Sequence, residues 1–251
     1  MYTSLRTALS AMAAGMIQVD IISNNLANVN TTAFRKERTG TQSFADIFRE
    51  YKTETGVGPV IIAGVTPGKG AKVLPTWRSL EPGTIRYTGD SCHVAIEGRG
   101  YFAVETQAGI RFTRDGRFQV NAGGWLVTVD GYRVLGEAGP IQVGAGLPAI
   151  NNDGTVTADG EMAGRITVVD FADENGLLKE GNNLYRVTEQ SGPAMPLEAR
   201  LLPGSLEGSN VDVMWEMAEL ISTTRFYEMN QKVVTAADDL LGKLANEVGR
   251  V

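Results

Sequence analysis

Apolar residues recur at helical spacing at both ends of the chain. Near the N-terminus they stand 4, 3, 4, 3 and 7 residues apart, with Ser23 at the open place of the repeat; they are Leu5, Leu9, Met12, Met16, Val19 and Leu26. A second 4-3 pattern is predicted to run as a helix from Val213 to Val248, capped by Asn210 or Asp212, and contains Met217, Leu220, Tyr227, Val234 and Leu241. A single amphipathic helix on a globular core is the ordinary explanation of one such stripe. Two stripes at opposite ends instead predict an antiparallel, coiled-coil-like pair with the rest of the chain inserted.

The middle of the chain changes from helical to alternating spacing after Trp77. Short strands are predicted, separated by turn pairs such as Asp115-Gly116 and Asp130-Gly131, which are expected to supply the positive φ of a tight hairpin. The predicted strands are 84–87, 94–96, 101–105, 111–113, 118–120, 125–128, 132–135, 164–171 and 183–187. Between the first helix and these strands, residues 41–76 are predicted to be an extended linker, with helical turns at Phe44–Tyr51 and a strand at Val60–Ala63. The predicted fold is α+β: a helical domain of residues 1–40 with 205–251, and a mostly antiparallel β domain of residues 77–204.

A turn rich in asparagine ends the first helix. Four Asn and two Thr stand in the eleven residues from Asn24 to Phe34. Their side chains compete for backbone hydrogen bonds and so stop a helix. Together with the two helical stripes, Asn24, Asn25, Asn28 and Phe34 are therefore candidate assembly residues.

Composition narrows the possible functions. The 251 residues carry a formal net charge of −6, which makes a nucleic-acid partner improbable. With one cysteine, Cys92, and one histidine, His93, the chain has neither an internal disulfide nor a Cys/His zinc site. The longest clean apolar run, Val60–Val65, is too short for a bilayer. Only Arg6 is positive near the N-terminus, so we expect no cleaved signal peptide.

No set of residues in the sequence assembles an active site. Neighbouring strand residues point to opposite faces, so Cys92 and His93 cannot act as a nucleophile and its base. The oxygen-rich stretch 151–161 lacks the spacing of a calcium loop, and Gly98-Arg99-Gly100 lacks the third glycine of a dinucleotide site. We predict no catalytic, metal or cofactor site, no membrane insertion, and a protein that assembles with copies of itself or with neighbours.

Four segments, in order along the chain, resemble the flagellar basal-body rod and hook family. They are Ser4–Arg38 with its Asn-rich turn, Val94–Phe102 followed by Phe112–Gly116, Asp170–Phe171 through Gly181–Tyr185, and Leu206–Val211 leading to Arg225–Asn230. Within that family, Asp130–Ile141 looks like the proximal rod type, whereas the length of Ser43–Val73 also suits the distal type. Ala33 stands where the family often has glycine.

The resemblance implies a structural subunit of the rod that crosses the periplasm. Its partners would be proximal and distal rod subunits, copies of itself, and the flagellar type III export apparatus. The terminal helices would line the tube, and the β domain would lie outside them. Two other classes compete: an enzyme that cleaves peptidoglycan, which would need a carboxylate pair in a cleft, and a surface adhesin built of hairpins, which would leave the terminal helices unexplained.

Overall fold

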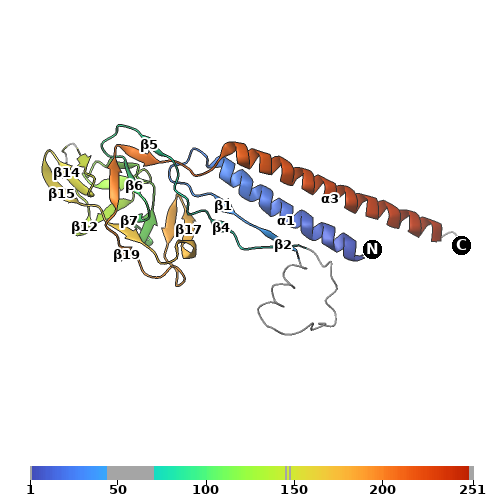
Figure 1. Cartoon of the computed structure of the whole chain (residues 1–251). Helices are drawn as coiled ribbons and strands as arrows, with labels where there is room; N and C mark the ends of the chain where they lie inside the picture. Colours follow the sequence, from blue (N-terminus) through green and yellow to red (C-terminus); the bar gives the residue numbers. More distant parts are fainter. Residues whose placement is uncertain (1, 44–70, 145, 147, 249–251) are drawn as a thin grey trace. The chain divides into compact units, whose positions relative to one another are not determined.

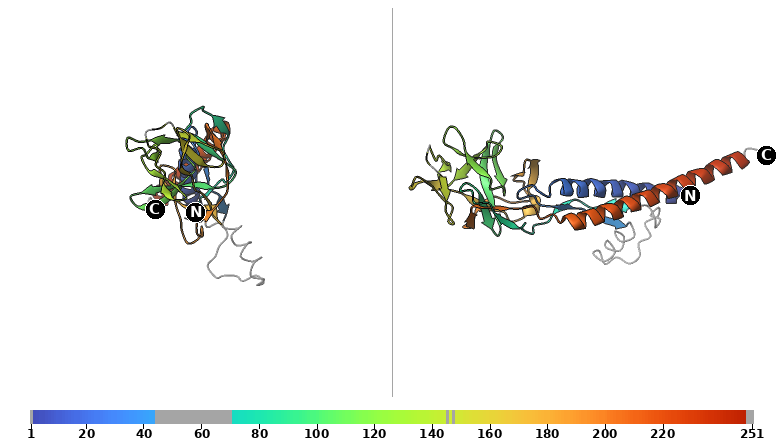
Figure 2. Two further views of the ribbon diagram at one scale, coloured as in Figure 1. Left: turned by 90° about the vertical axis from the view of Figure 1, so that its left-hand side faces the viewer. Right: turned by 90° about the horizontal axis from the view of Figure 1, so that it is seen from above.

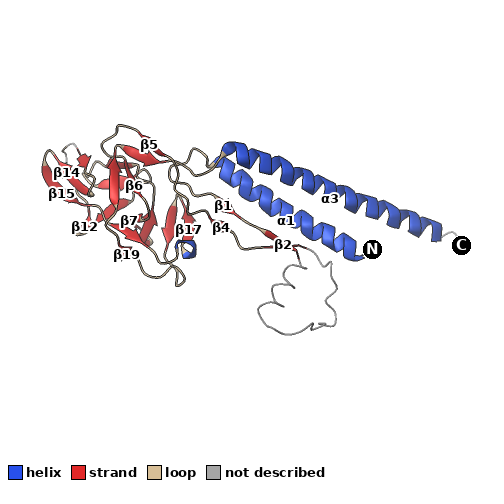
Figure 3. Cartoon of the chain, in the orientation of Figure 1, coloured by secondary structure: helices blue, strands red, loops and turns tan. Residues whose placement is uncertain are grey.

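The chain divides into two compact units. The computed structural model describes residues 2–43, 71–144, 146 and 148–248. The first unit contains Met1–Ala27, Glu37–Trp77 and Asp212–Val251, and the second contains Asn28–Lys36 and Arg78–Val211 (Figure 1). The fold is α+β, because both of the α-helices described belong to the first unit and most described strands belong to the second (Figure 3). The domain limits predicted at residues 40, 76 and 204 stay predictions.

The described part of the first unit contains two long helices and several short strands. Helix α1 covers Tyr2–Ala27, and helix α3 covers Val213–Val248, the range predicted from its spacing; the two run side by side (Figures 1 and 2). Asp212 Oδ1 caps α3 by accepting from the backbone N–H groups of Met214 and Trp215, at 2.9 and 3.2 Å. Strand β2 (Thr41–Ser43) pairs with β3 (Ala71–Val73), and β1 (Glu37–Arg38) pairs with β4 (Trp77–Arg78). The turns predicted at 44–51 and the strand at 60–63 lie outside the described residues.

The second unit is built from antiparallel strands. Its largest sheet has the order β17-β18-β8-β7-β11-β10-β9, with β12, β16 and β19 attached at its sides. These strands are β7 (Tyr101–Thr106), β8 (Gly109–Thr113), β9 (Phe118–Val120), β10 (Leu126–Thr128), β11 (Arg133–Gly136), β12 (Gly139–Pro140), β16 (Val168–Asp170), β17 (Leu178–Gly181), β18 (Leu184–Arg186) and β19 (Met195–Pro196). Smaller groups are β13-β14-β15, β20-β6 and β21-β5. Their strands are β5 (Ile85–Tyr87), β6 (Val94–Glu97), β13 (Pro148–Ile150), β14 (Thr155–Ala158), β15 (Glu161–Arg165), β20 (Arg200–Pro203) and β21 (Ser205–Glu207).

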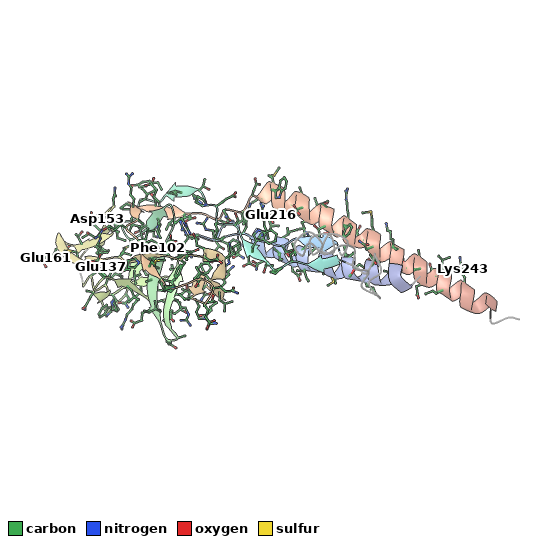
Figure 4. The ribbon with its side chains drawn as sticks, turned by 60° about the horizontal axis from the view of Figure 1, so that its bottom comes forward. Phe102, Glu137, Asp153, Glu161, Glu216 and Lys243 are labelled. Carbon is green, nitrogen blue, oxygen red and sulfur yellow. The ribbon has the colours of Figure 1, made fainter. Side chains whose placement is uncertain are left out.

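Strand β7 lies at the centre of this unit and is buried on both faces. Successive side chains of a strand point to opposite sides, so Tyr101 joins one apolar cluster and Phe102 the other. Phe102 packs edge-to-face on Phe118, with ring centroids 5.1 Å apart, and Tyr101 does the same with Phe171 at 5.7 Å. The continuous apolar run of β7 thus ties two cores together, and Figure 4 shows Phe102 within the β unit.

Two details of the predicted β region are wrong. The single strand predicted at 164–171 is interrupted at Ile166 and Thr167, so that its halves, β15 and β16, enter different sheets. The pair Asp115-Gly116 does not supply positive φ, since Gly116 is not among the left-handed glycines. Gly116 is needed for space instead, because an added Cβ would lie 1.6 Å from the carbonyl oxygen of Val94.

Candidate assembly surface

Asn25 joins three elements of the first unit. Its Nδ2 donates to the backbone carbonyl of Glu37 at 2.8 Å, and its Oδ1 accepts from the backbone N–H of Glu37 at 2.9 Å. The same Nδ2 also donates to Glu216 Oε2 on α3 at 3.2 Å. Asn25 is 2% exposed, so its amide satisfies buried groups on the strand and on the opposite helix at once.

The turn that follows α1 belongs to the second unit and is closed by its own side chains. Asn28 accepts twice from Thr31, through its backbone carbonyl from the N–H and through Oδ1 from the hydroxyl, both at 3.1 Å. Ala33 then takes a left-handed conformation, φ 56°, while 1% exposed. Only glycine adopts that region without steric cost. Phe34 is buried beneath the ammonium of Lys179, which lies 4.4 Å from its ring centroid.

A buried cluster of three charges holds the segment before α3 within the second unit. Glu207 pairs with Arg35 through Oε1 and with Arg114 through Oε2, each at 2.9 Å. Glu207 Oε1 also accepts from the backbone N–H of Gly83 at 3.0 Å. Burial lowers the pKa of Arg35, and the nearby Glu207 carboxylate counteracts part of that shift. All three side chains are almost fully buried, so this cluster fixes the backbone around residues 35 and 207 relative to the β sheet.

Arg114 also explains the glycines before β7. Its guanidinium donates to the carbonyl of Gly100 at 2.9 Å and to that of Gly98 at 2.7 Å. Both glycines have positive φ, and a Cβ on Gly100 would lie 2.7 Å from the side chain of Val168. The cluster was not predicted from the sequence, because no local spacing indicates a contact between residues 93 positions apart in the chain.

The face of α1 that contacts α3 differs by one residue position from the predicted stripe. Its buried residues are one large apolar residue, Ile22, and four small or polar ones, Ala8, Ala14, Gly15 and Asn25. A Cβ placed on Gly15 would lie 3.9 Å from the Cβ of Tyr227, so the helix backbones approach closely there. On α3 the residues with least exposure are Glu216 and Thr223, and Glu216 stands one position before the predicted Met217.

The predicted assembly residues therefore fall into two groups. Partly buried ones are Met12, Val19, Leu26, Asn28, Leu220, Tyr227 and Val234, and Asn25 and Phe34 are fully buried. Apolar ones left exposed are Leu9 and Met16 on α1, at 50% and 56%, and Met217 and Leu241 on α3, at 45% and 40%. Asn24 is also exposed, and the side chain of Leu5 lies outside the described set. In a single chain these residues do not form one seam.

The exposed face of α3 is unusually apolar. Besides Met217 and Leu241, it presents Met214, Trp215, Ile221, Phe226, Met229, Val233 and Leu240 to solvent. Large apolar side chains gathered along one element mark a site of protein or membrane contact. Within the described parts of the chain, neither helix is both long and apolar enough to cross a membrane.

The residues first searched for chemistry occupy ordinary surroundings. His93 Nδ1 lies 2.9 Å from the hydroxyl of Thr88, and Cys92 is a partly buried free thiol. Burial, helped by the negative charge of Asp90, raises the pKa of the Cys92 thiol, which makes it a weaker nucleophile. Among the residues that the structure describes, no group of three or more His, Cys, Asp and Glu side chains could hold a metal ion.

Three family models match the chain in the order of these features. The flagella basal body rod protein model matches residues 5–35, the flagellar hook protein FlgE/F/G D1 domain model matches 95–161, and the flagellar basal body rod FlgEFG protein C-terminal model matches 202–247. The matches thus include α1 with its Asn-rich turn, the strands around β7, and Glu207 with α3.

Curated relatives match over nearly their full length. The flagellar basal-body rod protein FlgG of Caulobacter vibrioides is 35% identical over 95% of this chain and 96% of its own. FlgG of Bacillus subtilis is 34% identical over 98% and 99%, and FlgF of Caulobacter vibrioides is 32% identical over 100% of both chains.

The chain belongs to the flagellar basal-body rod protein family. Its relatives are structural rod proteins, and this is not an enzyme family. The chain is accordingly a structural subunit of the flagellar rod type. Ala33, at a position where glycine was expected from the family resemblance, has the left-handed backbone conformation in that turn.

Proposed function

We propose that this chain is a proximal rod subunit that assembles with copies of itself and with other rod proteins into the axial shaft of the flagellar basal body. The exposed apolar face of α3, with Leu9 and Met16 on α1, carries the proposal. Each isolated subunit leaves this surface in water. Packing it against helices of adjacent subunits recovers about 25 cal/mol per Å² of apolar area.

The shaft requires contacts between two different faces of each subunit, since an assembly that does not close continues as a filament. In this proposal the helical domain, residues 1–40 with 205–251, is the assembly element. Its helices form a coiled-coil-like pair, and residues such as Leu9, Met16, Met217 and Leu241 contact neighbouring helices. The subunit passes through the type III export apparatus without signal cleavage, and it transmits torque across the periplasm.

The distal rod type is the second candidate. The more similar relatives carry the name FlgG, which is that of the distal type, at 35% and 34% identity against 32% for FlgF. The segment 130–141, which supports the proximal type, includes the hairpin of β11 and β12. Position along the shaft separates the two types: a label on the subunit should lie beside the membrane ring for the proximal type and beside the outer rings for the distal type.

The assembly role is tested with matched substitutions on one helix. Met217→Asp places a charge on the exposed apolar face, whereas Gln231→Asp adds the same charge at an exposed polar position. Both variants should fold, because neither site is buried in the single chain. Burying an unpaired carboxylate in a helix contact costs several kcal/mol, so Met217→Asp should be absent from purified basal bodies and the cells should not swim.

The control, Gln231→Asp, should assemble and swim. If Met217→Asp enters basal bodies as well as the control does, the apolar face of α3 is not the assembly surface.

A further inference from the structure

A cleft in the first unit is lined by carboxylates and tryptophans. It has a volume of about 270 Å³, and its lining includes Glu37, Glu216, Glu219, Arg38, Trp77 and Trp215. The described lining thus contains three carboxylates and one guanidinium. The volume lies below the roughly 300–1,000 Å³ of small-molecule sites, and so suits a single side chain better than a free metabolite.

Glu216 is the buried carboxylate of this cleft, and it has no counter-ion among the described residues. It is 5% exposed, and no cationic side chain among the described residues lies within ion-pair distance of it. Its Oε2 accepts from Asn25, whose own hydrogen bonds are then all used, and no described donor reaches its Oε1. A buried carboxylate is stable when it is paired or fully hydrogen-bonded. Figure 4 shows Glu216 in the first turn of α3.

Two tryptophans make the cleft selective for a planar cation. Trp77 and Trp215 are 43% and 62% exposed, although large aromatic rings are normally covered. Tryptophan is the best aromatic partner for a cation, and arginine combines stacking on such rings with bidentate bonds to carboxylates. We infer that this cleft is a socket for an arginine side chain of an adjacent subunit.

Arg225 of a second copy of this chain is the arginine assigned to this socket. It is the single arginine between Val213 and Val248, it is exposed, and within the described structure it pairs with no carboxylate. Along α3 it stands six to nine residues beyond Glu219 and Glu216, about 9–14 Å at 1.5 Å per residue. Each copy thus has the socket and Arg225 at different places on its surface, which allows the head-to-tail contact that an open assembly needs. The inference rests on the proposed function and names the contact.

The test is a competition inside one cell. Wild-type chain and a mass-tagged variant are expressed at equal levels, and their ratio is measured in purified basal bodies. Glu216→Gln keeps the shape of the side chain and the hydrogen bond from Asn25 while removing the negative charge. Arg225→Gln removes the guanidinium that would enter the socket. Each should lower the incorporated ratio at least tenfold. Glu228→Gln, an exposed carboxylate on α3 outside the cleft, should leave the ratio near one.

The possible results are distinguishable. Absence of the wild-type chain from basal bodies overturns the proposed function itself. If Glu216→Gln is incorporated as well as the wild-type chain, the arginine socket is refuted and the proposed function is not. If Glu216→Gln is not incorporated but Arg225→Gln is, Arg225 of a second copy is not the occupant of the socket. Circular dichroism of each purified full-length variant checks the fold; if Glu216→Gln loses helix, Glu219→Gln at the partly exposed wall of the cleft carries the test. Recovery of incorporation by Glu219→Arg combined with Arg225→Glu supports direct pairing.

Discussion

Glu207→Gln should destabilise the β unit more than any exposed charge change. The side chains of Glu207, Arg35 and Arg114 are only 3%, 6% and 2% exposed. Both carboxylate oxygens accept from guanidinium N–H groups, so the amide nitrogen of glutamine would point a donor at another donor. Removing the charge also leaves two guanidiniums buried without a counter-ion.

The expected cost follows from that geometry. Breaking a buried ion pair by removing one partner costs about 3–5 kcal/mol, a large share of the roughly 5–15 kcal/mol that stabilises a typical domain. For a chain of this size each kcal/mol lowers Tm by about 2–4 °C. Thermal unfolding of the β unit, followed by circular dichroism, should therefore show a Tm lower by about 6–20 °C.

The control is Glu97→Gln, whose partner Arg200 lies 3.5 Å away with both side chains more than half exposed. Exposed pairs contribute about 0–1 kcal/mol, less at high salt. A Glu207→Gln variant that melts within 2 °C of the Glu97→Gln control would refute the reasoning, since the buried cluster would then contribute no more than a surface pair.

Three further sets of substitutions each test one feature. Ala33→Gly removes a left-handed backbone strain of about 1–2 kcal/mol but also removes a buried methyl group worth about 0.8 kcal/mol. Its free energy of unfolding, measured by chemical denaturation, should therefore be close to that of the wild type. Ala33→Val should be clearly less stable, because a β-branched residue is strained at positive φ. Gly116→Ala places a methyl group against the carbonyl of Val94 and should lower the free energy of unfolding by more than about 4 kcal/mol. At Gly131 an added Cβ would meet no atom within 4 Å, so Gly131→Ala should lose only the strain of its positive φ. Cys92→Ser combined with His93→Gln should leave swarming motility near normal, because the two side chains cannot act as a nucleophile and its base. Loss of motility with a folded protein would contradict this.

The α+β class and the long C-terminal helix were predictable because their signals are local. A cap at Asn210 or Asp212 and a sustained 4-3 spacing predicted α3 without information from the rest of the chain, and the structure uses Asp212. Strand positions were also predictable, since glycine and aspartate mark the turns between them. The break at Ile166 was not, because it depends on a bridge to Gly136 from another part of the sheet.

The assembly surface could be predicted only in part. Counting large apolar residues selects Leu9 and Met16, whereas close packing of two helices selects Ala8 and Gly15, and a period alone does not decide between adjacent faces. Glu207 and its two arginines could not be found at all, because charged residues distant in sequence give no pattern until the fold places them together.

Asn25 also limits axial sliding between the two helices. A shift of α1 along α3 by one helical turn, about 5.4 Å, would separate its amide from Glu216 and from the backbone of Glu37 at the same time. Apolar contacts between small side chains re-form after such a slip at little cost, but a buried amide and a buried carboxylate do not find new partners. One asparagine therefore acts as a stop against shear, and the helix pair can bear load along its length without a covalent link.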